Sequence, residues 1–116
     1  MRIIAELTDA NFDQAITAAN VPVVVDFYAP WCGPCKMLAP LLNSLAEHFV
    51  GRLAFYKVNV EAAPELADRF EVSGVPMLIF FVNGEPRDLL IGFPSPPVLA
   101  EKLHALLETK PAEVRS

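Results

Sequence analysis

The sequence has little cysteine, few charged residues and no long apolar run. Two cysteines occur in 116 residues, which excludes a small secreted scaffold held together by several disulfides. Charged residues make up 20% and hydrophobic residues 53% of the chain, and this balance excludes general disorder. The longest apolar segment, Met77–Val82, has the length of a strand and falls far short of the roughly 18 residues of a membrane span.

Basic patches and targeting signals are also missing from the sequence. The nine basic residues form no run, and 14 acidic residues give a net charge of -5, so neither nucleic acid nor a membrane surface is an expected partner. The apolar stretch before Glu6 and Asp9 is too short for a secretory signal. At this length the sequence predicts one soluble domain, which we expect to be monomeric and cytoplasmic.

Hydrophobic periodicity alternates between extended and helical segments along the chain. Strands are predicted over residues 2–6, 23–28, 53–60, 77–82 and 87–91, and helices over residues 8–20, 35–49, 64–70 and from residue 96 onward. Thr8 and Ser95 are predicted helix N-caps, and Asn83-Gly84 predicts a hairpin turn. Helices between the early strands indicate parallel pairing. The fold class is therefore α/β, with a central mixed β-sheet flanked by helices on both faces.

Both cysteines, Cys32 and Cys35, lie between a predicted buried strand and a predicted helix. A helix start gathers unpaired N–H groups and the positive end of the dipole, which favour the thiolate of Cys32. A disulfide that closes a loop of about four residues would stabilise the chain by only about 2 kcal/mol. His48 and His104 lack the spacing of zinc ligands, so no metal site is expected. The pair is therefore interpreted as reactive rather than structural.

The residues around the cysteines resemble the active-site stretch of the thioredoxin family. Residues 27–36 read Phe-Tyr-Ala-Pro-Trp-Cys-Gly-Pro-Cys-Lys. Further matches to the family are Asp26, Pro40, Lys57, Val75-Pro76, Gly84 and Gly92. The resemblance covers nearly the whole chain and implies a thioredoxin fold. It assigns residues 1–109 to a thioredoxin domain and residues 110–116 to a frayed C-terminal tail.

The resemblance implies a protein-disulfide reductase, a thioredoxin-type electron carrier that works by thiol–disulfide exchange. Cys32 is the expected nucleophile and Cys35 the resolving cysteine. Asp26 is expected to exchange a proton with Cys35, and Lys57 to tune that acid. The implied partners are client protein disulfides and a thioredoxin reductase that is NADPH- or ferredoxin-linked. No bound cofactor is implied, because the electrons pass through the Cys32–Cys35 disulfide.

Asp26 also stands out without the resemblance, because it interrupts an apolar strand. Burial in such a strand raises the pKa of a carboxyl group. The alternative is a half-exposed aspartate at a strand end, with Lys57 as its salt-bridge partner.

An apolar surface around the sulfurs is expected to bind clients. By the resemblance, the Val75–Pro76 peptide bond is cis, lies against the cysteines, and presents the Val75 backbone to an extended client chain. The expected active-site loop residues are Trp31, Gly33 and Pro34, and the expected substrate-binding residues are Gly74, Val75, Pro76, Gly92 and Phe93.

Three positions depart from the commonest thioredoxin pattern. Tyr28 stands where tryptophan is usual, Met77 where threonine is usual, and Phe93 where a small residue is usual. Phe93 is expected to alter the choice of clients, because an aromatic ring near the reactive sulfur adds apolar contact area. Met77 suits core packing and client contact equally well.

Two other functions stay open at this point. Residues 27–32 also resemble domains of protein disulfide isomerases, so an isomerase or oxidase is one alternative. A non-catalytic subunit that uses the thioredoxin fold for binding is the other. Such a subunit could dock through the acidic face of Glu61, Glu65 and Asp68, although a solvated helix face explains those charges as well.

Overall fold

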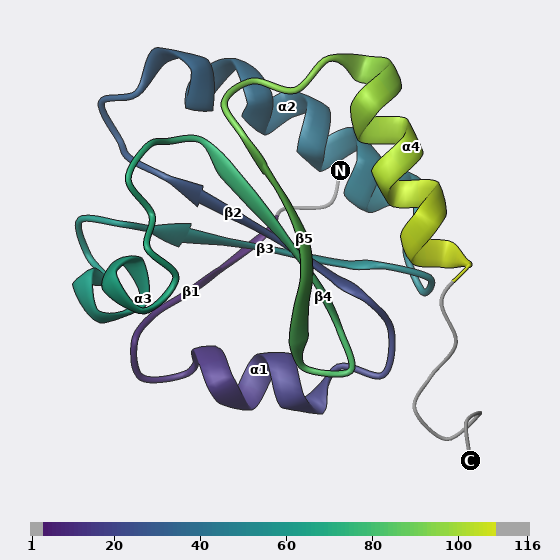
Figure 1. The fold of residues 1–116 in the computed structure, drawn as a ribbon, viewed down its shortest axis with the longest axis horizontal. Helices are drawn as coiled ribbons and strands as arrows, with labels where there is room; N and C mark the ends of the chain where they lie inside the picture. Colours follow the sequence, from purple (N-terminus) through teal and green to yellow (C-terminus); the bar gives the residue numbers. More distant parts are fainter. Residues whose placement is uncertain (1–3, 109–116) are drawn as a thin grey trace.

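The computed structural model describes residues 4–108 and alternates strands and helices in the predicted order (Figure 1). The strands are β1 (Ala5–Leu7), β2 (Val23–Tyr28), β3 (Ala54–Asn59), β4 (Met77–Val82) and β5 (Glu85–Ile91). The helices are α1 (Phe12–Ala18), α2 (Gly33–His48), α3 (Pro64–Arg69) and α4 (Pro96–Leu107). The predicted tail, residues 110–116, and the first two residues of the predicted first strand lie outside the described part of the chain.

The five strands form one sheet in the order β1-β3-β2-β4-β5. β3 runs parallel to β1 and β2, whereas β4 runs antiparallel to both β2 and β5. The predicted mixed sheet is therefore confirmed. Because β2 and β4 run in opposite directions, Phe27 near the end of β2 pairs with Met77 at the start of β4. This pairing brings the loop at residues 29–32, after β2, and the loop at residues 74–76, before β4, to the same end of the strands.

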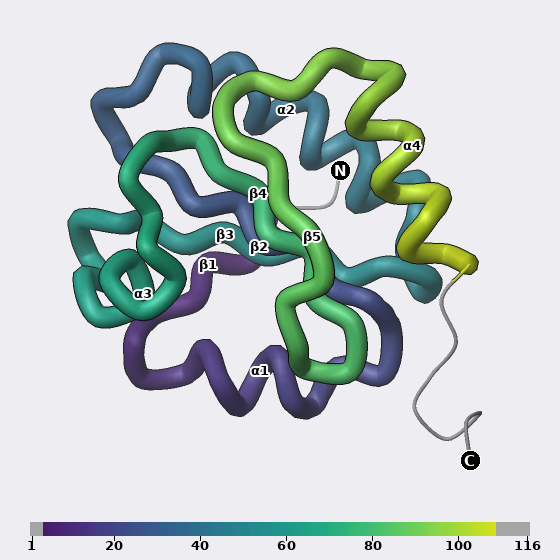
Figure 2. Tube along the Cα trace, in the orientation of Figure 1, coloured from purple at the N-terminus to yellow at the C-terminus, as the bar shows by residue number. Residues whose placement is uncertain are grey.

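Helices cover both faces of the sheet (Figure 2). Leu42 of α2 and Leu103 of α4 pack with Phe80 on one face, and Phe12 of α1 packs with Phe27 on the other. Full burial of such a side chain stabilises the fold by roughly 1.5–3 kcal/mol. Burial on both faces explains why β2 and β4 appear in the sequence as nearly continuous apolar runs.

The N-terminal cap predicted at Thr8 is wrong. The Thr8 N–H donates to Asn11 Oδ1 at 2.8 Å, and the Ala10 N–H donates to Thr8 Oγ1 at 3.2 Å. These local bonds hold the segment in a turn, because side-chain acceptors compete with helical hydrogen bonding. α1 therefore begins only at Phe12, after Asn11. The cap predicted at Ser95 is confirmed, since its side chain accepts from the Val98 N–H at 3.4 Å.

The β4–β5 hairpin turns at the predicted pair and contains an irregularity that was not predicted. Asn83 and Gly84 have φ values of 55° and 82°, as a two-residue turn of this type requires. Phe80 pairs with Asp88 but Phe81 with Pro86, so the register leaves one extra residue, Arg87, on β5. Such a bulge redirects the side chains that follow it.

Candidate active site

The two cysteines lie at the N-terminal end of α2. Cys32 is the N-cap, and its Sγ accepts the Cys35 N–H at 3.2 Å. The two residues form a disulfide with a Cα–Cα distance of 5.3 Å. Pro34 fits the first turn because that position needs no N–H donor. The helix begins at Gly33, two residues earlier than predicted, so both sulfurs lie where the helix dipole is positive.

The loop before β4 closes over the sulfurs. Cys32 Sγ lies 3.7 Å from the Val75 carbonyl oxygen, and the Val75–Pro76 peptide bond is cis, as the resemblance implied. The Gly92 N–H donates to the Pro76 oxygen at 2.8 Å, and Gly92 has a φ of 85°, a conformation that glycine adopts at little cost. Gly92 thus ties the end of β5 to the loop that faces the cysteines.

A small apolar cluster surrounds the disulfide. Cys32, Cys35 and Ala29 are buried together, and Tyr28, Val60 and Val75 pack against them. Val60 follows β3, and its N–H donates to the Tyr28 oxygen at 2.9 Å. The sequence analysis missed Val60. Its position at the end of the strand predicted over residues 53–60, which pairs with β2, was the available signal.

Large aromatic side chains are exposed next to the site in sequence, although Cys32 and Cys35 are each only 4% exposed. Trp31 is 67% exposed and Phe93 is 45% exposed, and the Trp31 Nε1–H donates to a carboxylate oxygen of Glu61. A Cβ atom added at Gly33 or Gly74 would meet no atom within 4 Å. The space beside each of these two glycines is therefore open.

Asp26 is buried beneath this site, so the alternative of a half-exposed strand end is wrong. Its side chain is 5% exposed, and among the described residues Oδ1 has no hydrogen-bond partner. Burial raises the pKa of Asp26 from 3.8 to about 7, against a smaller lowering by the charge of Lys57. Asp26 and Lys57 are paired positions of β2 and β3. Both line a pocket of about 150 Å³ that also reaches Cys35.

Tyr28 forms part of the wall of the Asp26 pocket. Its Oη donates to Glu6 Oε1 at 2.7 Å, and the Lys57 Nζ lies 5.7 Å from the centre of its ring. Burial and the Glu6 carboxylate raise the pKa of Tyr28 to about 12. The sequence analysis noted Tyr28 as a departure but missed Glu6. The register of β1 on β3 places Glu6 opposite Lys57, and parallel pairing of the two predicted strands was the signal for this contact.

Replacing Tyr28 with phenylalanine should lower the free energy of unfolding by about 0.5–1 kcal/mol, because the hydrogen bond to Glu6 is lost while the ring is kept. Equilibrium denaturation in urea measures the change. Glu6→Gln, which keeps an acceptor, should cost less than Glu6→Ala. A Tyr28→Phe protein as stable as the parent would show that the Tyr28–Glu6 bond contributes nothing.

The reactive groups that the site brings together are two sulfurs and one buried carboxyl group. Within residues 4–108, no three His, Cys, Asp or Glu side chains are grouped as metal ligands would be. None of the helices in that range is long and apolar enough to cross a membrane. The site geometry fits thiol chemistry.

Comparison with known proteins agrees with this geometry. The family model described as Thioredoxin matches residues 3–105. The chain belongs to the thioredoxin family. Similar thioredoxins include "Thioredoxin" of Staphylococcus haemolyticus (strain JCSC1435), which is 45% identical over 86% of this chain and 94% of its own length. "Thioredoxin 1" of Nostoc sp. (strain PCC 7120 / SAG 25.82 / UTEX 2576) is 36% identical over 89% of this chain and 96% of its own.

Chloroplastic thioredoxins are also similar, but they are longer. "Thioredoxin M2, chloroplastic" of Arabidopsis thaliana is 42% identical over 87% of this chain. The match spans 54% of that relative's length, so this chain covers about half of such thioredoxins. The predicted thioredoxin fold is confirmed by the family match together with the mixed five-stranded sheet and its four helices.

Proposed function

We propose that this chain is a protein-disulfide reductase that carries two electrons from a partner reductase to client disulfides. The observation that carries the proposal is the placement of Cys32 at the start of α2, with Cys35 one turn further and the Val75 carbonyl beside the sulfur. A helix N-terminus favours a thiolate, and the thiolate is the nucleophilic form of cysteine. The family match supports the same chemistry.

The reaction proceeds in two exchanges. The Cys32 thiolate attacks one sulfur of the client disulfide, which forms a Cys32–client bond and releases the other client sulfur as a thiolate. The Cys35 thiolate then attacks Cys32 Sγ, which forms the Cys32–Cys35 disulfide and releases the second client thiolate. Two electrons have passed to the client. A reductase returns two electrons and two protons to restore the dithiol.

Asp26 is proposed to take the proton from Cys35 before the second exchange. The pocket of about 150 Å³ reaches both residues, and a pKa of about 7 lets Asp26 gain and lose a proton near neutral pH. The charge of Lys57 lowers this pKa and so tunes the acid. The two residues act on Cys35 from beneath, whereas the client approaches from the open side.

The client is proposed to bind over the open side through Trp31, Gly33, Pro34, Gly74, Val75, Pro76, Gly92 and Phe93. Backbone pairing at Val75 accepts many sequences, because main-chain hydrogen bonds are independent of side chains. The apolar side chains among these residues add contact area. The exposed ring of Phe93 adds area at a position where a small residue is usual.

Insulin reduction with dithiothreitol as the electron source tests the proposal. The chain should accelerate precipitation of the insulin B chain far beyond dithiothreitol alone. Absence of turnover would overturn the reductase. A reduction potential measured against glutathione separates a reductase from an isomerase, which should be clearly more oxidising.

Replacing Phe93 with alanine should lower kcat/KM for protein disulfides by about three- to tenfold, because the ring's apolar contact with the client is lost. Reduction of several unrelated protein disulfides measures the effect. Val50→Ala, two residues beyond the C-terminal end of α2, is the matched control and should leave these rates unchanged. The role assigned to Phe93 fails if Phe93→Ala reduces every protein disulfide as fast as the parent.

The partner reductase is proposed to be NADPH- or ferredoxin-linked, and reduction of the oxidised chain by each type in turn decides between them. We also propose that the domain over residues 1–109 acts as a monomer, which light scattering in solution measures. The predicted cytoplasmic location stays a prediction, to be checked by fractionation of cells that produce the full natural protein.

A further inference from the structure

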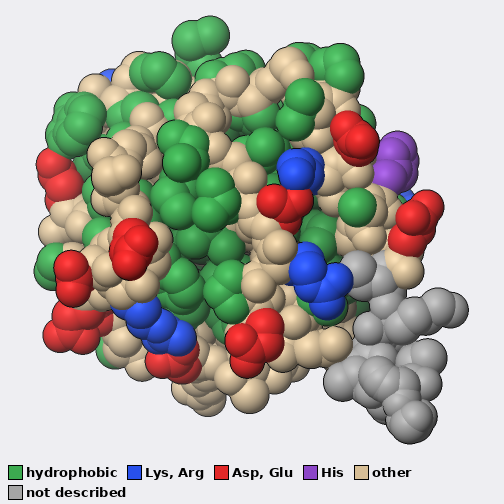
Figure 3. All heavy atoms as spheres, viewed as in Figure 1, with side chains coloured by type: hydrophobic (Ala, Val, Ile, Leu, Met, Phe, Trp, Pro, Cys, Tyr) green, Lys and Arg blue, Asp and Glu red, His purple; other side chains and the backbone are tan. Residues whose placement is uncertain are grey.

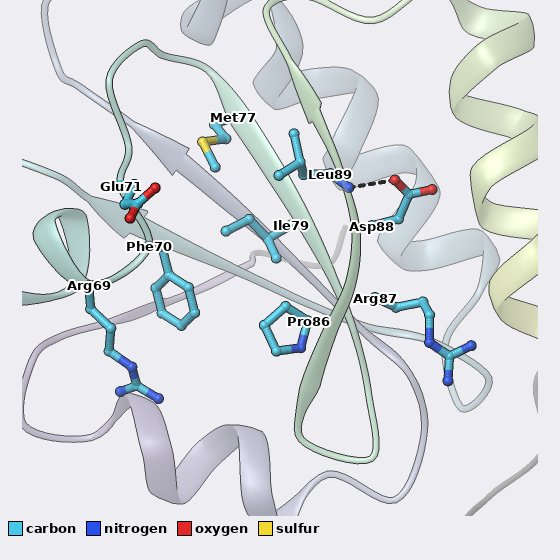
Figure 4. Close-up of a pocket in the computed structure, with 9 residues that line it drawn as sticks. All are labelled: Arg69, Phe70, Glu71, Met77, Ile79, Pro86, Arg87, Asp88 and Leu89. Atoms are coloured by element: carbon cyan, nitrogen blue, oxygen red, sulfur yellow. Dashed lines mark hydrogen bonds between the residues drawn. The ribbon is translucent and has the colours of Figure 1, made fainter.

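A hollow of about 510 Å³ lies between the end of α3 and strands β4 and β5. Figure 4 shows Phe70, Met77, Ile79, Pro86 and Leu89 gathered around it, on the face of the sheet that carries α1 and α3. We call these five residues and the hollow that they line the β4–β5 groove. Arg87 and Asp88 point to the other side of β5, toward α4. Arg69, Glu71, Arg87 and Asp88 also line the hollow, so five apolar side chains share its lining with four charged ones.

The groove is open because β5 lies at the edge of the sheet. Leu89 is paired with Ile79, and Ile91 with Met77, and directly opposite side chains lie on one face of a sheet. The β4 members are buried, but Leu89 is 45% exposed and Ile91 is 65% exposed. Large apolar side chains exposed in a row are the unusual observation here, because soluble proteins rarely leave them grouped.

This apolar row reaches the loop that faces Cys32, because the Gly92 N–H, next to Ile91, donates to the Pro76 oxygen. Leu89, Ile91 and Phe93 follow each other at alternate positions and are all exposed. Beside them, Met77 follows Pro76 in the loop that faces Cys32. Figure 3 shows hydrophobic side chains gathered over the middle of this face, with acidic and basic side chains along its lower rim. The groove is thus continuous with the surface at which the client disulfide reacts.

The outer edge of β5 offers little to a pairing strand at this point. Pro86 has no N–H, and the Leu89 N–H already donates to Asp88 Oδ1 at 2.8 Å. The other oxygen of Asp88 accepts from Lys102. Edges protected in this way resist strand addition by a second copy. This part of β5 is therefore a poor site for the addition of a strand.

The charges near the groove do not select a charged ligand. Arg69, at the α3 end, forms an ion pair with Asp13 at 2.9 Å and lies over the Phe70 ring. Glu71 beside it carries the opposite sign. An apolar group is the ligand chemistry that the five apolar side chains of the groove fit.

We propose that the β4–β5 groove is a second client subsite, which takes a bulky apolar side chain of the client near its reactive cysteine. The inference rests on the proposed function, because it needs a client held at Cys32 and Val75. Ile79 is three residues beyond Pro76, a span of about 10 Å along a strand. An extended client covers that span in three or four residues. The preferred client therefore carries leucine, methionine or phenylalanine three or four residues from its cysteine.

Chromogenic peptide disulfides test this subsite. Each peptide carries one cysteine as a mixed disulfide with 5-thio-2-nitrobenzoate, and has either leucine or serine at the third and fourth positions on one side of the cysteine. Both sides are tested separately. On one side the leucine peptide should react with the reduced chain about five- to tenfold faster than the serine peptide. Equal rates for leucine and serine on both sides would overturn the subsite.

Variants locate the preference in the groove. Leu89→Ser should lower the leucine-to-serine rate ratio to about one. Val50→Ser is the matched control, because Val50 is 53% exposed and lies two residues beyond the C-terminal end of α2. This variant should keep the full ratio. A ratio that survives Leu89→Ser would place the preference elsewhere and overturn the proposal.

The same assay separates this inference from the proposed function. If the chain reacts neither with the small disulfide 5,5′-dithiobis(2-nitrobenzoate) nor with any peptide, the proposed reductase function is wrong. If the chain reacts rapidly with the small disulfide, and with the leucine and serine peptides at equal rates, only the proposed subsite in the groove is wrong.

Discussion

Replacing Cys32 with serine should lower insulin reduction at least about a thousandfold, because a hydroxyl oxygen cannot form the mixed disulfide through which the electrons pass. Cys32 is the N-cap of α2, next to the Val75 carbonyl, so no other group in the described site occupies the attacking position. The initial rate of insulin precipitation with dithiothreitol measures the loss. Residual turnover near that of the parent would contradict the assignment of Cys32 as nucleophile.

Cys35→Ser is the companion variant, and it should fail at a different step. Its Cys32 still attacks the client, but no second thiolate releases the mixed disulfide. The variant should therefore accumulate covalent complexes with client proteins, visible on non-reducing gels and removed by dithiothreitol. The double variant Cys32→Ser/Cys35→Ser should form none. Trapping by the double variant would mean that the complexes are not the proposed intermediate.

Replacing Asp26 with alanine should raise the free energy of unfolding by about 3 kcal/mol at pH 8, while slowing the second exchange. Burial raises the pKa of Asp26 from 3.8 to about 7. At pH 8 this pKa difference lowers the free energy of unfolding of the parent by about 4 kcal/mol. The variant regains this amount, less the packing that it loses with the side chain. Urea denaturation at several pH values measures the effect.

The pH dependence of this gain has a definite sign. Below the unfolded pKa of 3.8 the carboxyl group is neutral in both states, so it costs nothing. As pH rises from 3.8 toward 7, the unfolded chain ionises while the folded chain keeps its proton, and the parent loses stability. The advantage of Asp26→Ala should therefore grow across this window and be constant above it. A variant less stable than the parent at pH 8 would contradict the buried, unpaired carboxyl group.

Asp88 provides a control, because its pKa is shifted in the opposite direction to that of Asp26. Its hydrogen bond with Lys102 lowers its pKa. Any stability that this carboxylate contributes is present above its unfolded pKa and is lost as pH falls through the folded one. Asp88→Ala should therefore not stabilise the chain at pH 8. If both variants raised stability equally, removal of net negative charge would explain the Asp26 result.

Much of the fold could be predicted because the hydrophobic pattern of each segment matches the way that segment is buried in the structure. β2 and β4 were predicted with their observed bounds, since burial on both faces makes each an apolar run. The same burial made Asp26 conspicuous. The reactive pair was recognisable because Cys32 and Cys35 lie at the start of a strongly periodic helix.

The remaining features depend on pairings that no local pattern encodes. The contact of Glu6 with Tyr28 requires the register of β1 on β3 and of β2 on β3. The groove requires the bulge at Arg87, which shifts the register of β5 by one residue. Thr8 shows the converse, since a residue suited to a cap was drawn into a turn by Asn11, three positions away.

The antiparallel pairing of β2 with β4 brings two separate stretches of sequence together at the site. We assign a different role to each stretch. The two cysteines and Asp26 lie within residues 26–35, from β2 into α2, and Lys57 of β3 lines the same pocket. The surfaces proposed to choose clients are built mostly within residues 70–93, around the β4–β5 hairpin. A new set of clients can therefore evolve, or be engineered, through exchanges in the hairpin alone, while the electron-carrying segment is inherited unchanged.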